Sequence, residues 1–170
     1  MALPDIAVGD LWTADVVQSL PQGVVYLGNR AAVAGPSSGT TALGIERIDN
    51  LVLKAGYRYM FVTSGIRATT SVTTSADHFK FALTYSSAGA ATSASSEIGR
   101  IEMGGQQTTD SLGMCVGFVV PGTTTSTASV LFYVVRTSGT GTLTTNNDTG
   151  GLWLHVIDLG VDVADTGVDV

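Results

Sequence analysis

The sequence predicts an all-β fold, an antiparallel β-sandwich of the jelly-roll type preceded by a short N-terminal arm and helix. Three observations predict it: short segments alternate like strands, clusters of Gly, Ser, Thr, Asn and Asp separate them, and no helical period follows Gly23. A parallel βαβ fold is excluded because it needs crossover helices between its strands. The predicted strands are 24–27, 42–48, 51–53, 57–62, 79–85, 98–103, 114–120, 129–136, 140–145 and 152–159.

Residues 51–85 contain the clearest alternation. Aromatic residues occupy every second position from Tyr57 to Phe61, and large apolar residues occupy every second position from Phe79 to Tyr85. Because side chains two positions apart share one face of a strand, each of these strands has an aromatic face and a mixed face. We therefore expect a half-buried sheet with these two strands at its core.

Three predicted strands are apolar on both faces, namely 114–120, 130–135 and 152–157. A strand that is apolar on both faces must bury both, whereas a simple sandwich buries only one. The second face is covered either by a neighbouring subunit or by a helix or loop of the same chain. The sequence leaves both alternatives open.

The composition favours one domain with an unusually uncharged surface. The chain has 170 residues, which suits a single buried core. Charged residues make up 13%, which is about half the usual share, and mean hydropathy is +0.32. No run approaches the roughly 20 apolar residues of a membrane-spanning helix, so we expect no membrane insertion. A surface of Ser, Thr, Gly and Ala is typical of a protein covered by its own copies or by an assembly, although a threonine-rich monomeric sheet has a similar composition.

The charge balance argues against a nucleic-acid partner. The net charge is -6 and the basic residues are scattered singly, whereas binding phosphates needs clustered Lys and Arg. The single cysteine, Cys115, lies in an apolar run, where a thiol behaves as a small hydrophobic side chain. No secretory signal is visible at the N-terminus, so we expect synthesis in a reducing cytosol.

The chain divides into three predicted regions. Residues 1–22 form an arm and a short helix, residues 23–160 form the sandwich, and residues 161–170 form an acidic tail. The helix begins at Thr13 as N-cap and stops at Pro21. About two turns are too few to be stable alone, so the helix must dock on its own sheet or around a symmetry axis with its copies. The expected attachment and oligomer contacts are Leu11, Trp12, Val16, Val17 and Leu20.

Motifs for nucleophilic catalysis are weak. Residues 35–39 fit G-x-S-x-G with Ser37 at its centre, but a nucleophile elbow needs a strand before it and a helix after it, and a strand is predicted after it. His78 and His155 each stand on a predicted strand without a second ligand at metal spacing, so we interpret them as residues of a sheet face. Cys115 has no local partner that would favour a thiolate.

Calcium-binding patterns are also incomplete. Oxygen ligands are available at 146–148 and at Asp162, Asp165 and Asp169, yet neither group has the calcium loop D-x-[DN]-x-[DN]-G with a distal Glu. A hairpin turn and a solvated tail are the simpler interpretations. We therefore predict no enzyme activity, no catalytic residues, no metal and no cofactor.

Three short runs carry a family resemblance. The run GDLWTADVV at 9–17 resembles the opening of many bacteriophage fibre and minor tail proteins. The run LKAGYRY at 53–59 resembles the L-x-A-G-x-R-Y strand entry of small virion proteins of tailed phages of actinobacteria, and LHVIDLG at 154–160 is similar to their V-x-D-L-G closing strand. The sequence departs from this pattern at Trp12, Gln18 and Val161 and in the added tail.

The resemblance implies a trimeric jelly roll on the phage surface, made in the bacterial host cytoplasm. It would be a minor tail or fibre-like protein whose partners are its own copies, other tail or major capsid proteins and the host surface, with loops 69–77, 86–96 and 121–127 as its exposed tip. The first alternative is a capsid decoration protein. A second is a carbohydrate-binding module, which needs exposed aromatic residues, whereas Trp12 and Trp153 lie in the helix start and the last strand. An esterase using Ser37 is the remaining alternative.

Overall fold

The computed structural model describes residues 23–30, 37–38, 40–63, 67–71, 77–104, 114–146 and 152–162, and the regular elements in these ranges are all β-strands. The predicted arm and helix, including Leu11, Trp12, Val16, Val17 and Leu20, lie outside the described residues, and so do residues 163–170. The strands are β1 Gly23–Arg30, β2 Ser37–Ser38, β3 Leu43–Leu53, β4 Tyr57–Thr63, β5 Arg67–Thr70, β6 His78–Ser86, β7 Ser96–Gly104, β8 Val116–Val119, β9 Thr125–Ser138, β10 Leu143–Asn146 and β11 Leu152–Val161.

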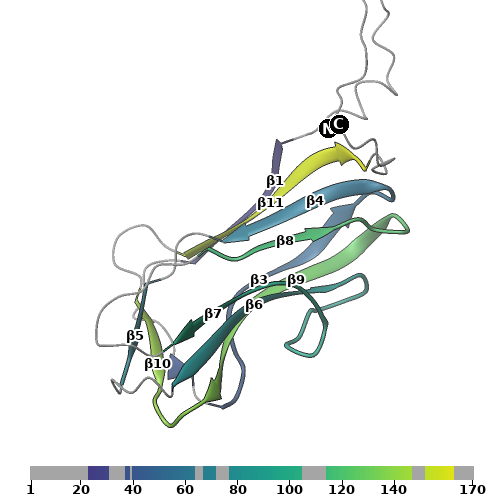
Figure 1. Cartoon of the computed structure of the whole chain (residues 1–170). Coiled ribbons are helices and arrows are strands. Elements are labelled where there is room, and N and C mark those ends of the chain that lie inside the picture. Colours follow the sequence, from purple (N-terminus) through teal and green to yellow (C-terminus); the bar gives the residue numbers. More distant parts are fainter. Residues whose placement is uncertain are drawn as a thin grey trace, which may run out of the picture.

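Two four-stranded antiparallel sheets form the sandwich (Figure 1). Their strand orders are β1-β11-β4-β8 and β3-β9-β6-β7, which we call the first and the second sheet. This order, in which the first and last long strands are neighbours and the chain crosses repeatedly between sheets, is that of a jelly roll. The predicted fold class is therefore confirmed. A small sheet of order β2-β10-β5 lies at one end of the sandwich.

The core lies between the inner faces of the two sheets. Phe61 projects into it from β4, Phe79 and Phe81 from β6, and Phe132 from β9, and all four rings are fully buried. The rings of Phe81 and Phe132 are stacked, with centroids 6.1 Å apart. The predicted aromatic faces of 57–62 and 79–85 do face the core, but β4 and β6 belong to opposite sheets rather than to one.

The predicted strands 42–48 and 51–53 are one strand, β3. Its register against β9 shifts between Ile48 and Leu51, and Asn50 between them has a φ of 58°. Asn tolerates this left-handed conformation better than other residues with a side chain. Asp49 and Asn50, the polar residues between the two predicted strands, are therefore part of a bulge, which bends the strand without ending it.

The two sheets approach backbone to backbone along one edge of the sandwich, between β7 and β8. A Cβ atom on Gly99 would lie 2.1 Å from the carbonyl oxygen of Val116, and one on Gly117 would lie 2.8 Å from the carbonyl oxygen of Ile98. Glycine in a strand interior often marks such a close approach. At the opposite edge, the backbone N–H of Val52 donates to the Tyr26 hydroxyl at 2.8 Å, which joins β3 to β1.

The polar loops do not form a single tip. Asp77 immediately precedes β6 and the loop 87–95 follows it, so the two lie at opposite ends of one strand. Such a strand is about 3.3 Å long per residue, which separates its ends by most of the length of the sandwich. The expectation that 69–77 and 86–96 share one exposed tip is therefore wrong.

The final strand also extends past its predicted boundary. β11 ends at Val161, and the N–H of Asp162 donates to the carbonyl of Gly56 at 2.7 Å. The carboxylate of Asp162 pairs with Arg58 at 2.7 Å. The first two residues assigned to the acidic tail are thus held on the first sheet.

Candidate interaction surface

The outer side of the first sheet carries an apolar surface over β4, β8 and β11. Residues directly opposite one another in antiparallel strands share a face of the sheet. Met60 in β4 is opposite Phe118 in β8 and Ile157 in β11, and Val62 is opposite Val116 and His155. We define the apolar face as Met60, Val62, Val116, Phe118, Val120 and Ile157.

The edge strand β8 contributes the most exposed part of this surface. Cys115 and Gly117 are buried toward the core, whereas Met114, Val116, Phe118 and Val120 are 56%, 39%, 53% and 42% exposed. Four consecutive outward positions in β8 and the residues that flank it are therefore large and apolar, while Cys115 and Gly117 between them are buried. Soluble monomers rarely leave contiguous apolar residues of this kind exposed, and such surfaces usually mark interaction sites.

Little charge interrupts the apolar face. Among the side chains of the first sheet that the structure describes, Arg58 is the one Lys, Arg, Asp or Glu on the outer face of the strands, and it lies at the end where β4 begins. Its guanidinium is paired with Asp162 at 2.7 Å. A partner surface therefore meets apolar side chains over most of this face and an ion pair only at its margin.

The outer side of the second sheet has the opposite character, because ion pairs cover it. Lys80 Nζ lies 3.0 Å from Glu97 and 5.6 Å above the ring of Tyr133. These contacts raise the pKa of Lys80, with the hydrogen bond to Glu97 as the largest cause. Arg100 lies 3.6 Å from Glu97 and 3.9 Å from Glu102.

The loop 87–95 also folds back over the second sheet. Its Ala91 is buried, and the Ala91 N–H donates to Ser129 Oγ at 3.0 Å. Ser129 in turn donates to Asp49 at 2.6 Å, and Thr84 Oγ1 donates to the carbonyl of Thr92 at 2.9 Å. Beside strand 130–135, at Ser129 and Thr84, part of the outer face is thus covered by a loop of the same chain, and a contact with a neighbouring subunit stays a prediction. The outer face of β8 has no such cover among the described residues.

We expect Ser129→Ala to release this loop. The change removes the acceptor of the buried Ala91 N–H, and an unpaired buried amide costs about 1–3 kcal/mol. Hydrogen exchange of residues 87–95 should accelerate while exchange in β4 and β11 stays unchanged. Ser126→Ala, an exposed serine of the same strand, is the matched control. Equal exchange rates in both variants would contradict the role given to Ser129.

The residues considered for nucleophilic catalysis are not brought together. Ser37 lies in the two-residue strand β2 opposite Thr144 of β10, not at a strand-to-helix turn. His78 begins β6 in the second sheet, whereas His155 is in β11 of the first sheet. The interpretation of both histidines as sheet-face residues is confirmed. Among the described residues, no group of three His, Cys, Asp or Glu side chains has the arrangement of a metal site.

Two buried carboxylates hold the backbone. Asp77 accepts from the N–H groups of Thr140 and Gly141 at 2.7 and 3.0 Å. Asp158 accepts from the N–H of Gly160 at 2.7 Å, two residues along β11. Gly160 has a φ of 87°, so this bond fixes the irregular end of the strand. Both carboxylates stabilise turns, and neither lines the apolar face.

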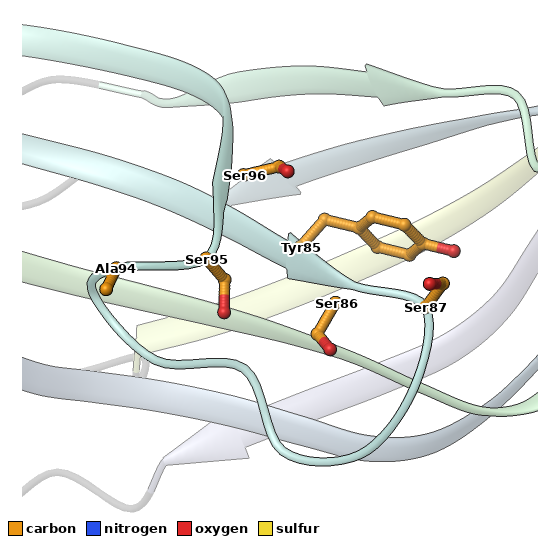
Figure 2. A pocket seen from close by; sticks show the side chains of 6 residues that line it. All are labelled: Tyr85, Ser86, Ser87, Ala94, Ser95 and Ser96. Atoms are coloured by element: carbon orange, nitrogen blue, oxygen red, sulfur yellow. The ribbon is translucent and has the colours of Figure 1, made fainter.

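A polar hollow of about 330 Å³ lies where the loop 87–95 joins β6 and β7. It is lined by Tyr85, Ser86, Ser87, Ala94, Ser95 and Ser96. Figure 2 shows that these side chains do not converge, because the Tyr85 ring extends toward Ser87 while the hydroxyls of Ser86 and Ser95 point toward the loop. Burial raises the pKa of the Tyr85 hydroxyl. The lining contains no charged side chain and no histidine.

Cys115 is fully buried beside the core, as the apolar run predicted. Burial raises the pKa of its thiol to about 11, from an ordinary value of 9.0. In the unfolded chain the thiol ionises near pH 9, whereas in the folded chain it stays protonated, so the unfolded state binds fewer protons between these values. Stability that is present below pH 9 is therefore lost as the pH rises toward 11.

We expect the free energy of unfolding, measured by denaturant titration, to fall by about 1–2 kcal/mol between pH 8 and pH 10.5. The Cys115→Ala variant, although less stable at every pH, should lose less over the same interval. The buried hydroxyls of Tyr59 and Tyr85 also have raised pKa values and contribute in the same direction above pH 10 in both proteins. An identical pH dependence in both proteins would contradict the assignment to Cys115.

The sequence did not single out Met114, Val116, Phe118 and Val120 as site residues. The available signal was the alternation within 114–120, in which Cys115 and Gly117 are small and their neighbours are large. That pattern distinguishes an inward from an outward face, but not a covered from an uncovered one.

No protein-family model matches the chain, and neither does any curated protein sequence. Several solved structures are similar in fold. The Eiger TNF of S. frugiperda has a TM-score of 0.46 and 9% identity, over 88% of this chain and 100% of that chain. The carbohydrate-binding module CBM6cm-2 of Cellvibrio mixtus lichenase 5A has a TM-score of 0.32 and 14% identity, over 82% and 90%.

A third similar structure contains the CBM22-1 and GH10 modules of Clostridium thermocellum xylanase 10B. Its TM-score is 0.37 and its identity 10%, over 85% of this chain but 30% of that chain. These similarities concern the fold alone, and no function is transferred from them. The described residues also contain no helix long and apolar enough to cross a membrane.

Proposed function

We propose that the chain is a structural virion protein of a tailed bacteriophage, a trimeric minor tail or fibre-like surface protein that associates through the apolar face. The observation that carries this proposal is the contrast between the two outer faces of the sandwich. The second sheet is covered by ion pairs and by the loop 87–95, whereas the first sheet presents Phe118 and its aliphatic neighbours to solvent. Burying such a surface between subunits is strongly favourable.

The low charge of the chain supports the same proposal. A particle subunit buries much of its surface against neighbours, and interface cores are depleted of charged residues. The resemblance of residues 9–17, 53–59 and 154–160 to phage proteins supplies the kind of particle. A capsid decoration protein, which would use the same apolar face against the capsid lattice, is the alternative within this class.

Electron microscopy of labelled particles tests the proposal. Gold-labelled antibodies against this chain would be applied to virions purified from cells infected with the phage that encodes it. Label at one end of the particle supports a tail protein, and label at many regularly spaced positions supports a decoration protein. Particles without label, with the chain recovered only from the soluble fraction, would overturn the virion role.

A carbohydrate-binding role makes a different prediction from the same surface. Sugar rings stack on exposed aromatic side chains, and among the aromatic side chains whose burial the structure describes, Phe118 is the exposed one. Its neighbours are Met60, Val116 and Val120, which offer no hydrogen bonds to sugar hydroxyls. Specific binding on a glycan array that Phe118→Ala abolishes would favour the carbohydrate module over the structural role.

A further inference from the structure

We propose that the apolar face binds the same face of a second copy of this chain, so that like residues meet around a symmetry axis. This inference rests on the proposed function and names both the partner and the surface. It is argued from the charge distribution of the two outer faces and from the position of Phe118.

The apolar face restricts the chemistry of its partner. It presents Met, Val, Ile and Phe side chains over three strands, with the half-buried imidazole of His155 beside Val62 and one ion pair, Arg58 with Asp162, at its margin. A charged partner surface would lose its hydration against these side chains without gaining opposite charges, which is costly. The occupant is therefore itself apolar and almost uncharged over the contact.

The outer face of the second sheet fails this requirement. Its Lys80, Glu97 and Arg100 form ion pairs that are partly exposed to water. Packing the apolar face of one copy on this surface of the next would bury these pairs against Phe118. That head-to-tail arrangement would also leave an apolar face exposed at the end of every open stack, because heterologous contacts close only in rings.

The apolar face is complementary to itself. Like-to-like contact places apolar side chains on both sides of the interface and leaves each Arg58–Asp162 pair at the rim, where it remains hydrated. A closed assembly of this kind leaves no apolar face unmatched. In the trimer proposed above, the three apolar faces meet around the three-fold axis.

Phe118 is the central side chain of this contact. It lies opposite Met60 in β8, the outermost strand of its sheet, with Val116 two residues before it and Val120, which directly follows the strand, two residues after it. Aromatic side chains contribute large buried areas and dominate interface energetics. In a like-to-like contact, the Phe118 side chains of neighbouring copies lie near the symmetry axis and therefore near one another.

A disulfide cross-linking experiment tests this geometry. The native Cys115 is fully buried, so an introduced surface cysteine is the reactive thiol in the full-length chain. Oxidised Phe118→Cys should form a covalent dimer through a single cysteine, which requires the same residue from two copies to meet. Arg100→Cys, an exposed position on the second sheet, is the control and should stay monomeric on denaturing gels.

The native mass in solution gives a second readout. Phe118→Asp should raise the dissociation constant of the assembly about 100-fold, because each copy would bury a carboxylate in an apolar contact. Val52→Asp is the matched control, since Val52 is 55% exposed and lies in β3, away from the apolar face. Circular dichroism of both variants should remain that of a folded β protein.

The outcomes separate the two proposals. If the wild-type chain is oligomeric but Phe118→Asp leaves its mass unchanged and Arg100→Cys cross-links as well as Phe118→Cys, the like-to-like interface is wrong while the structural role stands. If the wild-type chain is monomeric at every concentration yet is found in virions, the apolar face meets another virion protein and the inference also fails. A monomer that is absent from virions overturns both proposals.

Discussion

Gly99→Ala should destabilise the fold by about 3 kcal/mol or more. The added Cβ would lie 2.1 Å from the carbonyl oxygen and 2.8 Å from the carbonyl carbon of Val116. These are backbone atoms of β8, so no side-chain rotation can relieve the overlap. The variant can form only if β7 and β8 separate, which opens the sandwich along one edge.

Urea denaturation of Gly99→Ala and Gly104→Ala measures this effect. Both glycines are in β7, but a Cβ on Gly104 would lie 3.9 Å from His78 Cε1, at ordinary contact distance. Gly104→Ala should therefore be neutral or slightly stabilising, since alanine loses less backbone entropy than glycine on folding. Midpoints for the two variants within the error of one another would contradict the close approach of the sheets.

The close approach at Gly99 and Gly117 shows which features of the fold the sequence pattern predicts and which it does not. Gly99 and Gly117 both interrupt predicted strands, and glycine inside a strand indicates a bulge or a close neighbour. Nothing in the local pattern says that the neighbour of each is the strand carrying the other. Alternation likewise predicted the buried faces of 57–62 and 79–85 correctly, but it did not reveal that these strands belong to opposite sheets, because a period of two specifies faces and not partners.

The small strands were missed for a related reason. β5 (Arg67–Thr70) and β2 (Ser37–Ser38) are short, polar and without alternation, and each is a strand because β10 pairs with it. β5 and β10 are separated by more than seventy residues of sequence, so only the complete fold brings them together. Segments of this kind do not have a strand signal of their own.

The candidate site was predictable in part. Two-sided apolar strands were predicted at 114–120 and at 130–135, and both have large outward side chains. What distinguishes them is the loop 87–95, anchored on Ser129 and, through it, on Asp49. These contacts join residues far apart in the chain, so the sequence could not show that the loop covers β9 and leaves β8 exposed.

Phe81→Ala and Phe118→Ala should separate folding from assembly. Phe81 is fully buried and stacks on Phe132, so its loss leaves a cavity that costs about 3–5 kcal/mol, a large share of the stability of a domain this size. Phe118 is 53% exposed, so its loss should change the stability of the monomer by about 0.5 kcal/mol or less. Thermal unfolding of both variants at low protein concentration measures these terms.

The dependence of the melting temperature on concentration then identifies what Phe118 does. Association stabilises the folded state by mass action, so the melting temperature of the wild-type chain should rise as its concentration increases. Phe81→Ala should lower the whole curve and keep its slope, because the apolar face is intact. At low concentration, the melting temperature of Phe118→Ala should be near that of the wild-type chain. It should then stay constant as the concentration rises, because the folded monomer is unaffected while its copies no longer bind tightly. If the melting temperature of Phe118→Ala still rose steeply with concentration, the copies would associate through contacts elsewhere on the chain. The cost of a cavity cannot produce such a slope, because it does not depend on concentration.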